Sequence, residues 1–190
     1  MTRVGVADGV GDVPPRIPRQ SADEPGSKRA DIDARLGDEL ASVVSGARRR
    51  AVRDGDRQID TAHLLHSLLE YDPEARAVFE DGAQLARLLG YLVQRSIGYG
   101  LRWQGSVEDS GAVSVVTVTV TEGFSPLAAG ALEYAGRRAA RRGAEHACGT
   151  DLLAGLVVDP EARAVEVLGR AGIDAGAVRG RVESRVPRVF

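Results

Sequence analysis

The residues best suited to metal binding or nucleophilic catalysis fall into two small groups. His63 and His66 lie three positions apart, and His146 lies two positions before Cys148. Imidazole and thiolate groups bind zinc, and a thiol beside an imidazole can act as a nucleophile. Neither group has a Cys-x-x-Cys pair, an acidic partner at ligand spacing or an orienting carboxylate. We therefore expect no metal, no cofactor and no enzyme, and we interpret the histidines as helix-surface residues and Cys148 as a buried thiol.

The basic residues limit the phosphate chemistry that is open to the chain. Of the 25 basic residues only Lys28 is a lysine, and it stands between Ser27 and Arg29. A P-loop needs a lysine directly before serine or threonine, so no such nucleotide-binding motif is present. The net charge of −2 gives no overall positive field that would attract nucleic acid or a membrane surface.

Arginine runs leave one alternative function open. One run spans residues 48–50, and a second comprises residues 137–138 and 141–142. Two basic helix faces can bind phosphates, so a nucleic-acid-binding regulator is the alternative. Aromatic residues make up only 4% of the chain, too few for extensive base stacking. A solvated, salt-bridged helix face, or a docking surface for an acidic partner, explains the runs more simply.

These residues belong to a chain with an internal repeat. The heptapeptide DPEARAV occurs at residues 72–78 and again at 159–165. Upstream, a Leu-Leu pair recurs and Leu36 aligns with Phe124, both at an offset of 88. The sequence is therefore duplicated, with repeat one at residues 36–97 and repeat two at residues 124–186. Copies of this size are too small to be comfortably stable alone, so we expect one domain over residues 33–186.

Each copy has the apolar spacing of four helices. Apolar residues recur at every third or fourth position, which predicts amphipathic helices and an all-α fold. We expect Thr61 and Thr150 to be the N-caps of the second helices, and Ser125 followed by Pro126 to begin the first helix of copy two. The Asp-Pro-Glu steps at residues 72–74 and 159–161 predict the starts of the third helices.

The remaining segments differ in character. Residues 116–121 alternate valine and threonine, and Tyr99, Leu101 and Trp103 alternate upstream, which predicts a β-hairpin over residues 98–121, inserted between the helical copies. Residues 1–32 are rich in glycine, proline and aspartate and are predicted to be a disordered tail. The chain has no long apolar run, no signal peptide and a single cysteine. We therefore expect a cytoplasmic protein without a membrane span.

Four short motifs occur in a fixed order within this duplicated chain. Residues 60–65 read DTAHLL, residues 124–128 read FSPLA, residues 152–156 read LLAGL and residues 172–174 read GID. Together they resemble the Clp N-terminal domain, or Clp repeat domain, of the Clp/Hsp100 AAA+ chaperones. That family opens its repeats with Phe-Thr-x-x-Ala, begins the second helix with Gly-Thr-Glu-His-Leu-Leu and follows it with a Leu-Gly-Ile/Val-Asp turn.

The resemblance implies two pseudo-symmetric four-helix repeats that recognise substrates or adaptors for a Clp protease. Without a P-loop, the chain resembles a free-standing actinobacterial protein of this type, a non-enzymatic adaptor or decoy. The implied partners are Clp ATPase or protease subunits or their substrates, and the implied ligands are phosphoarginine or cyclic peptides in a groove between the repeats. The residues to which the resemblance assigns binding are Leu36, Asp38, Thr61, His63, Phe124, Ser125, Thr150 and Asp151.

Overall fold

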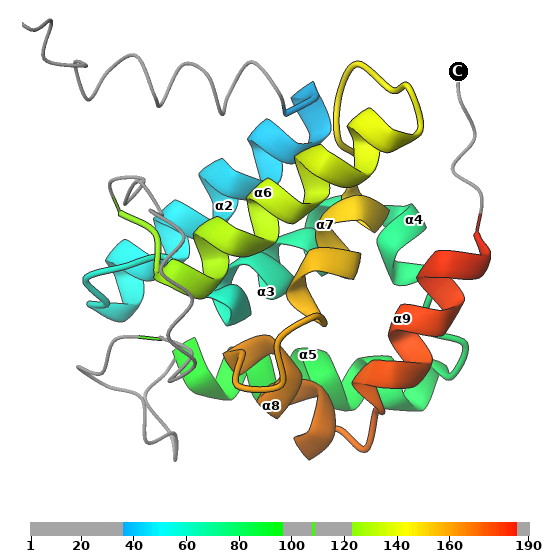
Figure 1. Cartoon of the computed structure of the whole chain (residues 1–190). Helices are drawn as coiled ribbons and strands as arrows, with labels where there is room; N and C mark the ends of the chain where they lie inside the picture. Colours follow the sequence, from blue (N-terminus) through cyan, green and yellow to red (C-terminus); the bar gives the residue numbers. More distant parts are fainter. Residues whose placement is uncertain (1–35, 97–107, 109–122, 186–190) are drawn as a thin grey trace, which may run out of the picture.

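The described part of the protein is helical. The computed structural model describes residues 36–96, 108 and 123–185. Its elements run in the order α2 (Asp38–Asp54), α3 (Thr61–Tyr71), α4 (Pro73–Arg76), α5 (Gly82–Ser96), α6 (Pro126–Arg141), α7 (Gly149–Leu156), α8 (Arg163–Arg170) and α9 (Ala175–Ser184) (Figure 1). Within these ranges there is no β-strand beyond two isolated bridges, which confirms the predicted all-α class. The predicted tail at residues 1–32 lies outside the described residues, as does the predicted hairpin at 98–121 apart from Glu108.

The core is built around α3 and α7. Residues 61–69 of α3 and the whole of α7 are buried, and the leucines of both helices are at most 1% exposed. A helix that is apolar all round must be enclosed by other elements. Accordingly, α2 packs on α3, α6 and α9 pack on α7, and α8 contacts both α3 and α5 (Figure 1). Among the described helices, none is both long and apolar enough to cross a lipid bilayer.

Small residues let the outer helices approach the core helices closely. A Cβ added to Gly155 of α7 would lie 2.5 Å from the carbonyl oxygen of Ala131 in α6. Where α2 crosses α3, the Ser67 hydroxyl donates a 2.7 Å hydrogen bond to the carbonyl oxygen of Val43. Ser67 and Gly155 are 88 positions apart, as are Val43 and Ala131. The same close crossing therefore recurs at the offset of the sequence repeat.

Three helices begin with the capping residues that the sequence predicts. Ser125 caps α6 by accepting a hydrogen bond from the Ala128 amide at 3.1 Å, and Pro126 lies in the first turn. The Asp72 carboxylate caps α4, again with a proline in the first turn, and Asp174 caps α9. Each side chain satisfies amide groups that have no partner within the helix.

Two predicted caps are wrong by one or two positions. The N-cap of α3 is Asp60 rather than Thr61, because the Asp60 carboxylate accepts a hydrogen bond from the His63 amide at 2.9 Å. The N-cap of α7 is Cys148 rather than Thr150. Both threonines instead lie inside the first turn of their helices, which leaves the Thr61 hydroxyl free to make tertiary hydrogen bonds.

The third helix of the second half begins later than predicted. Asp159 accepts a hydrogen bond from the Glu161 amide at 2.8 Å, but residues 160–162 do not form a helix and α8 begins at Arg163. The Arg163 amide donates to the carboxylate of Glu108 at 2.7 Å. The shared heptapeptide thus starts a helix directly in one half and after a turn in the other.

The α6–α7 crossing predicts that Gly155→Ala destabilises the fold. The two helices must separate to admit the added Cβ, and we expect the free energy of unfolding to fall by about 1–3 kcal/mol. Gly136→Ala in α6 is the matched control, because its Cβ would meet nothing within 4 Å. Helix propensity should make that change stabilising by up to about 1 kcal/mol. Urea unfolding measures both, and equal effects would contradict the packing argument.

Candidate functional site

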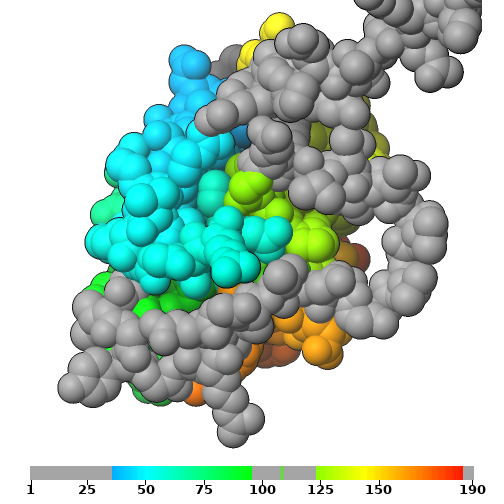
Figure 2. All heavy atoms as spheres, turned by 90° about the vertical axis from the view of Figure 1, so that its left-hand side faces the viewer, coloured from blue at the N-terminus to red at the C-terminus, as the bar shows by residue number. Residues whose placement is uncertain are grey.

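The start of each first helix pairs with the start of the second helix from the other half. Phe124 forms a parallel bridge with Ile59, and Leu36 forms one with Ala147. The first bridge is closed by the Ser125 amide, which donates to the Ile59 carbonyl oxygen at 2.8 Å. Figure 2 shows the end of α2 and the residues after it (cyan) against the start of α6 (yellow-green) on this face. The predicted site residues therefore assemble in two crossed groups.

These groups are largely internal. Of the eight residues predicted for binding, only Asp38 is exposed, in the first turn of α2. The other seven are buried, with relative exposures between 0% and 7%. One group brings Phe124 and Ser125 to Thr61 and His63 at the start of α3, and the other brings Leu36 to the start of α7, where Thr150 and Asp151 lie.

A buried carboxylate fills the first group. Glu108, which is 4% exposed, accepts hydrogen bonds through Oε2 from the Thr61 amide at 2.9 Å and the Ser125 hydroxyl at 2.7 Å. Its Oε1 accepts from the Thr61 hydroxyl and from the Arg163 amide. Four donors from three helix starts thus converge on one carboxylate, and we call these donors the Glu108 pocket. No motif points to Glu108, because it lies between the repeats.

A second buried carboxylate, Asp60, lies at the N-cap of the same helix. The guanidinium groups of Arg95 from α5 and Arg163 from α8 both contact its Oδ2, Arg163 at 2.6 Å. Burial alone would raise the pKa of Asp60, but hydrogen bonds from His63 and Arg163 and the charge of Arg95 hold it well below its usual range. Asp60 therefore ties α5 and α8 to α3.

His63 lies within this acidic cluster. Its Nδ1 accepts a hydrogen bond from the Asp60 amide at 3.1 Å, and its Nε2 faces Asp56 at 3.3 Å and Asp54 at 3.6 Å. Ligand atoms of Asp56, Asp60 and His63 are close enough together to surround a cation, but Arg95 already contacts both carboxylates. The guanidinium supplies the positive charge that a metal would bring. The predicted surface position of this histidine is wrong, since it is 1% exposed.

At the corresponding place in the other half, Asp151 is paired with Arg138 of α6 and with Arg142, the C-cap of that helix. Arg138 contacts Asp151 Oδ1 at 3.0 Å, and Arg142 donates to both carboxylate oxygens. Burial favours the neutral acid, but the hydrogen bonds from Arg142 and Cys148 lower the pKa of Asp151. The basic run of α6 is thus partly used inside the fold, and Arg137 forms an ion pair with Glu133 on the same helix.

Cys148 lies in the same environment, half-buried, with its Sγ 3.2 Å from Asp151 Oδ2. Burial, followed by the negative charge of Asp151, raises the pKa of the Cys148 thiol. An activated nucleophile needs the opposite direction.

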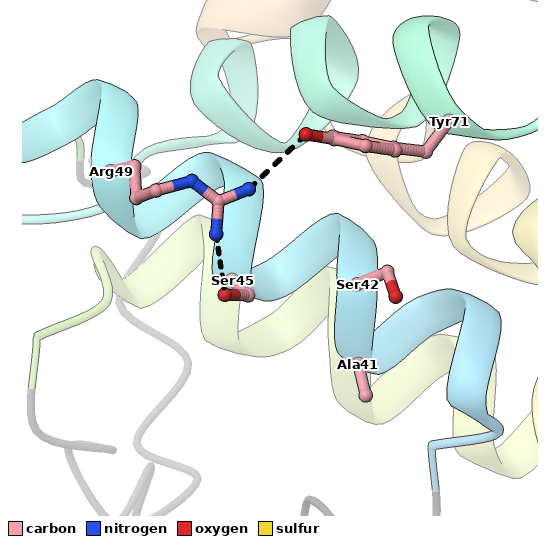
Figure 3. Close-up of a pocket in the computed structure, with 5 residues that line it drawn as sticks. All are labelled: Ala41, Ser42, Ser45, Arg49 and Tyr71. Atoms are coloured by element: carbon pink, nitrogen blue, oxygen red, sulfur yellow. Dashed lines mark hydrogen bonds between the residues drawn. The ribbon is translucent and has the colours of Figure 1, made fainter.

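The molecular surface carries a shallow open hollow between α2 and α3. Its volume is about 370 Å³, and it is lined by Ala41, Ser42, Ser45, Arg49 and Tyr71 (Figure 3). The Arg49 guanidinium donates to the Ser45 hydroxyl at 2.9 Å and to the Tyr71 hydroxyl at 3.1 Å. Tyr71 is 47% exposed, so the hollow presents an aromatic ring beside a cation and two serines.

Comparison with known proteins finds a match in structure. No family profile and no curated protein matches the chain. The N-terminal domain of the caseinolytic-protease-associated chaperone ClpD from Arabidopsis thaliana matches with a TM-score of 0.54 and 18% identity, over 79% of this chain and 93% of that one. A protein from a malarial protein secretion system matches with a TM-score of 0.55 and 15% identity, over 78% and 92%. The chain therefore has a fold like that of a Clp chaperone N-terminal domain.

His66 of α3 makes the stability of the fold depend on pH. It is 8% exposed, so its predicted surface position is wrong as well. Burial, together with the charges of Arg50 and Arg53, lowers the pKa of His66 from 6.5 to about 4, against the opposing charges of Glu70 and Asp54. Between these values the unfolded chain binds a proton at this site and the folded chain does not.

We therefore predict that the free energy of unfolding falls as the pH is lowered from 6.5 towards 4, and that His66→Gln flattens this part of the profile. The stability that the neutral imidazole contributes is fully present above pH 6.5, which fixes the sign. Urea unfolding at a series of pH values measures the slope. An unchanged slope in the variant would contradict the assignment to His66.

The Glu108 pocket predicts that Glu108→Gln is strongly destabilising. The amide nitrogen of glutamine would face donors, and buried donors would lose a charged acceptor. We expect a loss of about 2–3 kcal/mol in the free energy of unfolding. Glu145→Gln removes a carboxylate that is 90% exposed and should change stability by less than about 0.5 kcal/mol. Similar losses for both variants would show that Glu108 does not bind in this pocket.

Proposed function

We propose that this chain is a non-catalytic recognition module of a Clp chaperone and protease system, acting on protein substrates or adaptors. The observation that carries the proposal is the fold, which matches an N-terminal domain of a Clp chaperone over 93% of that domain. The sequence contains no P-loop, so the module supplies recognition rather than ATP-driven work. We propose that it acts as an adaptor or a decoy in the cytoplasm.

We infer that the two halves are pseudo-symmetric repeats within one domain over residues 33–186. Two contacts support this organisation. Phe124 lies 88 positions after Leu36, and Ala147 lies 88 positions after Ile59. The bridges Leu36–Ala147 and Phe124–Ile59 therefore join equivalent positions of the two halves. Cys148 corresponds in the same way to Asp60 as the N-cap of the second helix. Leu36 of the first half contacts the second half, and Phe124 of the second half contacts the first half. Either half alone would therefore lose these contacts. The inserted hairpin at 98–121 remains part of this proposal.

The exposed part of the recognition surface is, in this proposal, the hollow between α2 and α3. Tyr71 offers an aromatic face, and Arg49 offers a cation held by two hydroxyls. An aromatic and arginine pair is typical of residues that dominate binding energy at protein interfaces. Leu36 and Phe124, the buried residues just before α2 and α6, hold these helices against the core. They therefore support the recognition surface from beneath.

The hollow suits peptide segments, including cyclic peptides, better than phosphoarginine. A guanidinium ligand needs an accessible carboxylate fork. The Asp151 carboxylate is already bound by Arg138 and Arg142. Of the two acidic residues predicted to bind a ligand, Asp38 and Asp151, Asp38 is exposed and Asp151 is buried.

Neither alternative function gains support from the site. Binding of nucleic acid would need arginines directed to solvent, whereas Arg138 and Arg142 face Asp151. Catalysis by Cys148 would need a lowered thiol pKa, whereas burial raises the pKa of this thiol.

The proposal predicts that the purified chain changes the rate at which a Clp ATPase and protease complex degrades an unfolded protein such as casein. An adaptor raises the rate and a decoy lowers it. Arg49→Ala combined with Tyr71→Ala should weaken the effect about tenfold or more, because both changes remove side chains of the hollow. The control is Glu133→Ala combined with Arg137→Ala, which removes an exposed ion pair on α6 and should leave the effect intact. A rate unchanged by any amount of the chain would refute the proposal.

A further inference from the structure

We propose that the surface hollow between α2 and α3 is a receptor for a peptide segment that carries one carboxylate side chain next to an aromatic side chain. The carboxylate pairs with Arg49, and the aromatic ring packs on Tyr71. This inference rests on the proposed function, because it names the class of peptide that the recognition surface selects.

Arg49 presents a positive charge that forms no ion pair within the described ranges. Its guanidinium donates to two hydroxyls, Ser45 at 2.9 Å and Tyr71 at 3.1 Å (Figure 3), rather than to a carboxylate. Glu70, which is next to Tyr71 in the chain, is bound by Arg50 instead. Neutral acceptors hold the guanidinium in place without removing its charge. An anionic ligand therefore gains a charge-assisted hydrogen bond here without displacing another acid.

The two hydroxyls beside Arg49 are oriented to donate to a ligand. Each oxygen accepts from the guanidinium, and neither Ser45 nor Tyr71 gives its own hydroxyl proton to another described residue. Both protons therefore remain for a ligand. The Ser42 hydroxyl differs, because it donates to the carbonyl oxygen of Asp38 at 3.0 Å. One cation and two hydroxyl donors thus line the same hollow, and this set of donors suits a carboxylate.

The corresponding face of the other half lacks this arrangement. Arg137 lies 88 positions after Arg49, and Glu133 lies 88 positions after Ser45. The Glu133 carboxylate pairs with Arg137 within α6, so a residue of the same helix neutralises that arginine. Serine at position 45, one helical turn before Arg49, is therefore what leaves the charge of Arg49 available.

The aromatic side of the hollow belongs to a part of α3 that extends beyond the length of α7. The two helices begin 88 positions apart, but α3 has 11 residues and α7 has 8. Tyr71 is the last residue of α3. Gly46 of α2 lets its ring lie close, because a Cβ there would be 2.8 Å from Tyr71 Cε2. The tyrosine remains 47% exposed, so its ring can pack against an aromatic side chain of a ligand.

The charges around the hollow favour a carboxylate over a phosphate group. One guanidinium balances the single negative charge of a carboxylate, whereas a phosphorylated side chain carries about −1.5 to −2. Ala41 and Ser42, which line the hollow away from Arg49 (Figure 3), follow the exposed acids Asp38 and Glu39 by three positions. These acids repel additional negative charge. The preferred ligand is therefore a peptide with a single acid rather than a polyanion.

The test measures the fluorescence anisotropy of short peptides that bind to the full chain. The acidic peptide is Gly-Ser-Leu-Phe-Glu-Leu-Gly-Ser-Gly with blocked termini and an uncharged fluorophore, and its matched partner has glutamine in place of the glutamate. We expect the acidic peptide to bind the wild-type chain roughly tenfold more tightly, because its carboxylate accepts charge-assisted hydrogen bonds. This preference should shrink as the salt concentration is raised.

The substitution Ser45→Glu gives Arg49 the carboxylate partner that Glu133 provides for Arg137. It should weaken binding of the acidic peptide by roughly tenfold or more and leave the glutamine peptide nearly unaffected, because like charges repel across the contact. Ser184→Glu is the matched control, since it makes the same change at an exposed position at the end of α9. It should keep the wild-type preference.

Equal binding of the acidic and glutamine peptides to the wild-type chain overturns the proposal, as does an unchanged preference in Ser45→Glu. Tighter binding of a peptide with phosphoserine in place of the glutamate overturns it as well. So does a dimer of the chain, seen in sedimentation, that Ser45→Glu disrupts, because a second copy would then occupy the hollow. Should Ser45→Glu fail to fold, as judged by circular dichroism, Arg49→Gln replaces it, and an unchanged preference in that variant has the same meaning.

The failure of this inference and the failure of the proposed function give different results. Peptide binding is measured without a Clp complex, whereas the casein assay measures degradation. A chain that changes the rate of casein degradation but does not prefer the acidic peptide keeps the proposed function and loses this inference. A chain that leaves casein degradation unchanged loses the proposed function, whatever peptide it prefers.

Discussion

The fold depends on two carboxylates that are buried at the start of α3. Moving a charged group out of water is costly unless it is paired and hydrogen-bonded, so Asp60 and Glu108 each demand several partners. Asp60 takes the guanidinium groups of Arg95 and Arg163. Glu108 takes donors at the starts of α3, α6 and α8. Four helices consequently meet at one point, and Arg163 contacts both carboxylates, one with its side chain and the other with its amide.

The two halves meet the same requirement in different ways. At α3 the acid is the N-cap, Asp60, and its cations come from α5 and α8. At α7 the acid is Asp151, three positions after the Cys148 N-cap, and its cations come from α6 and from the C-cap of α6. Each of these two helix starts thus has a buried acid, and the arginines that pair with it come from different parts of the chain. Part of the arginine run in α6 has a structural role for this reason, which weakens its interpretation as a phosphate-binding stripe.

Much of the fold could be predicted from the sequence, but the arrangement of the site could not. The spacing of leucines and alanines marks the helices, and Ser125, Asp72 and Asp174 mark three of their starts. The caps of α3 and α7 differ from the predicted residues because each helix start has several candidate polar residues within three positions. The burial of His63 and His66 does not follow from the sequence pattern, because residues 61–69 of α3 are all buried and polar residues of a helix are ordinarily assigned to an exposed face.

The sequence by itself determined the helical class and the approximate positions of the described helices, because these arise from local periodicity and from caps that act within a few residues. Only the tertiary structure decided which charges are buried and what neutralises them. Asp60 finds Arg95 across 35 positions and Arg163 across 103, and Glu108 reaches Arg163 across 55. Such pairs have no short-range signature, since their energy comes from excluding water around groups that meet only when the helices pack.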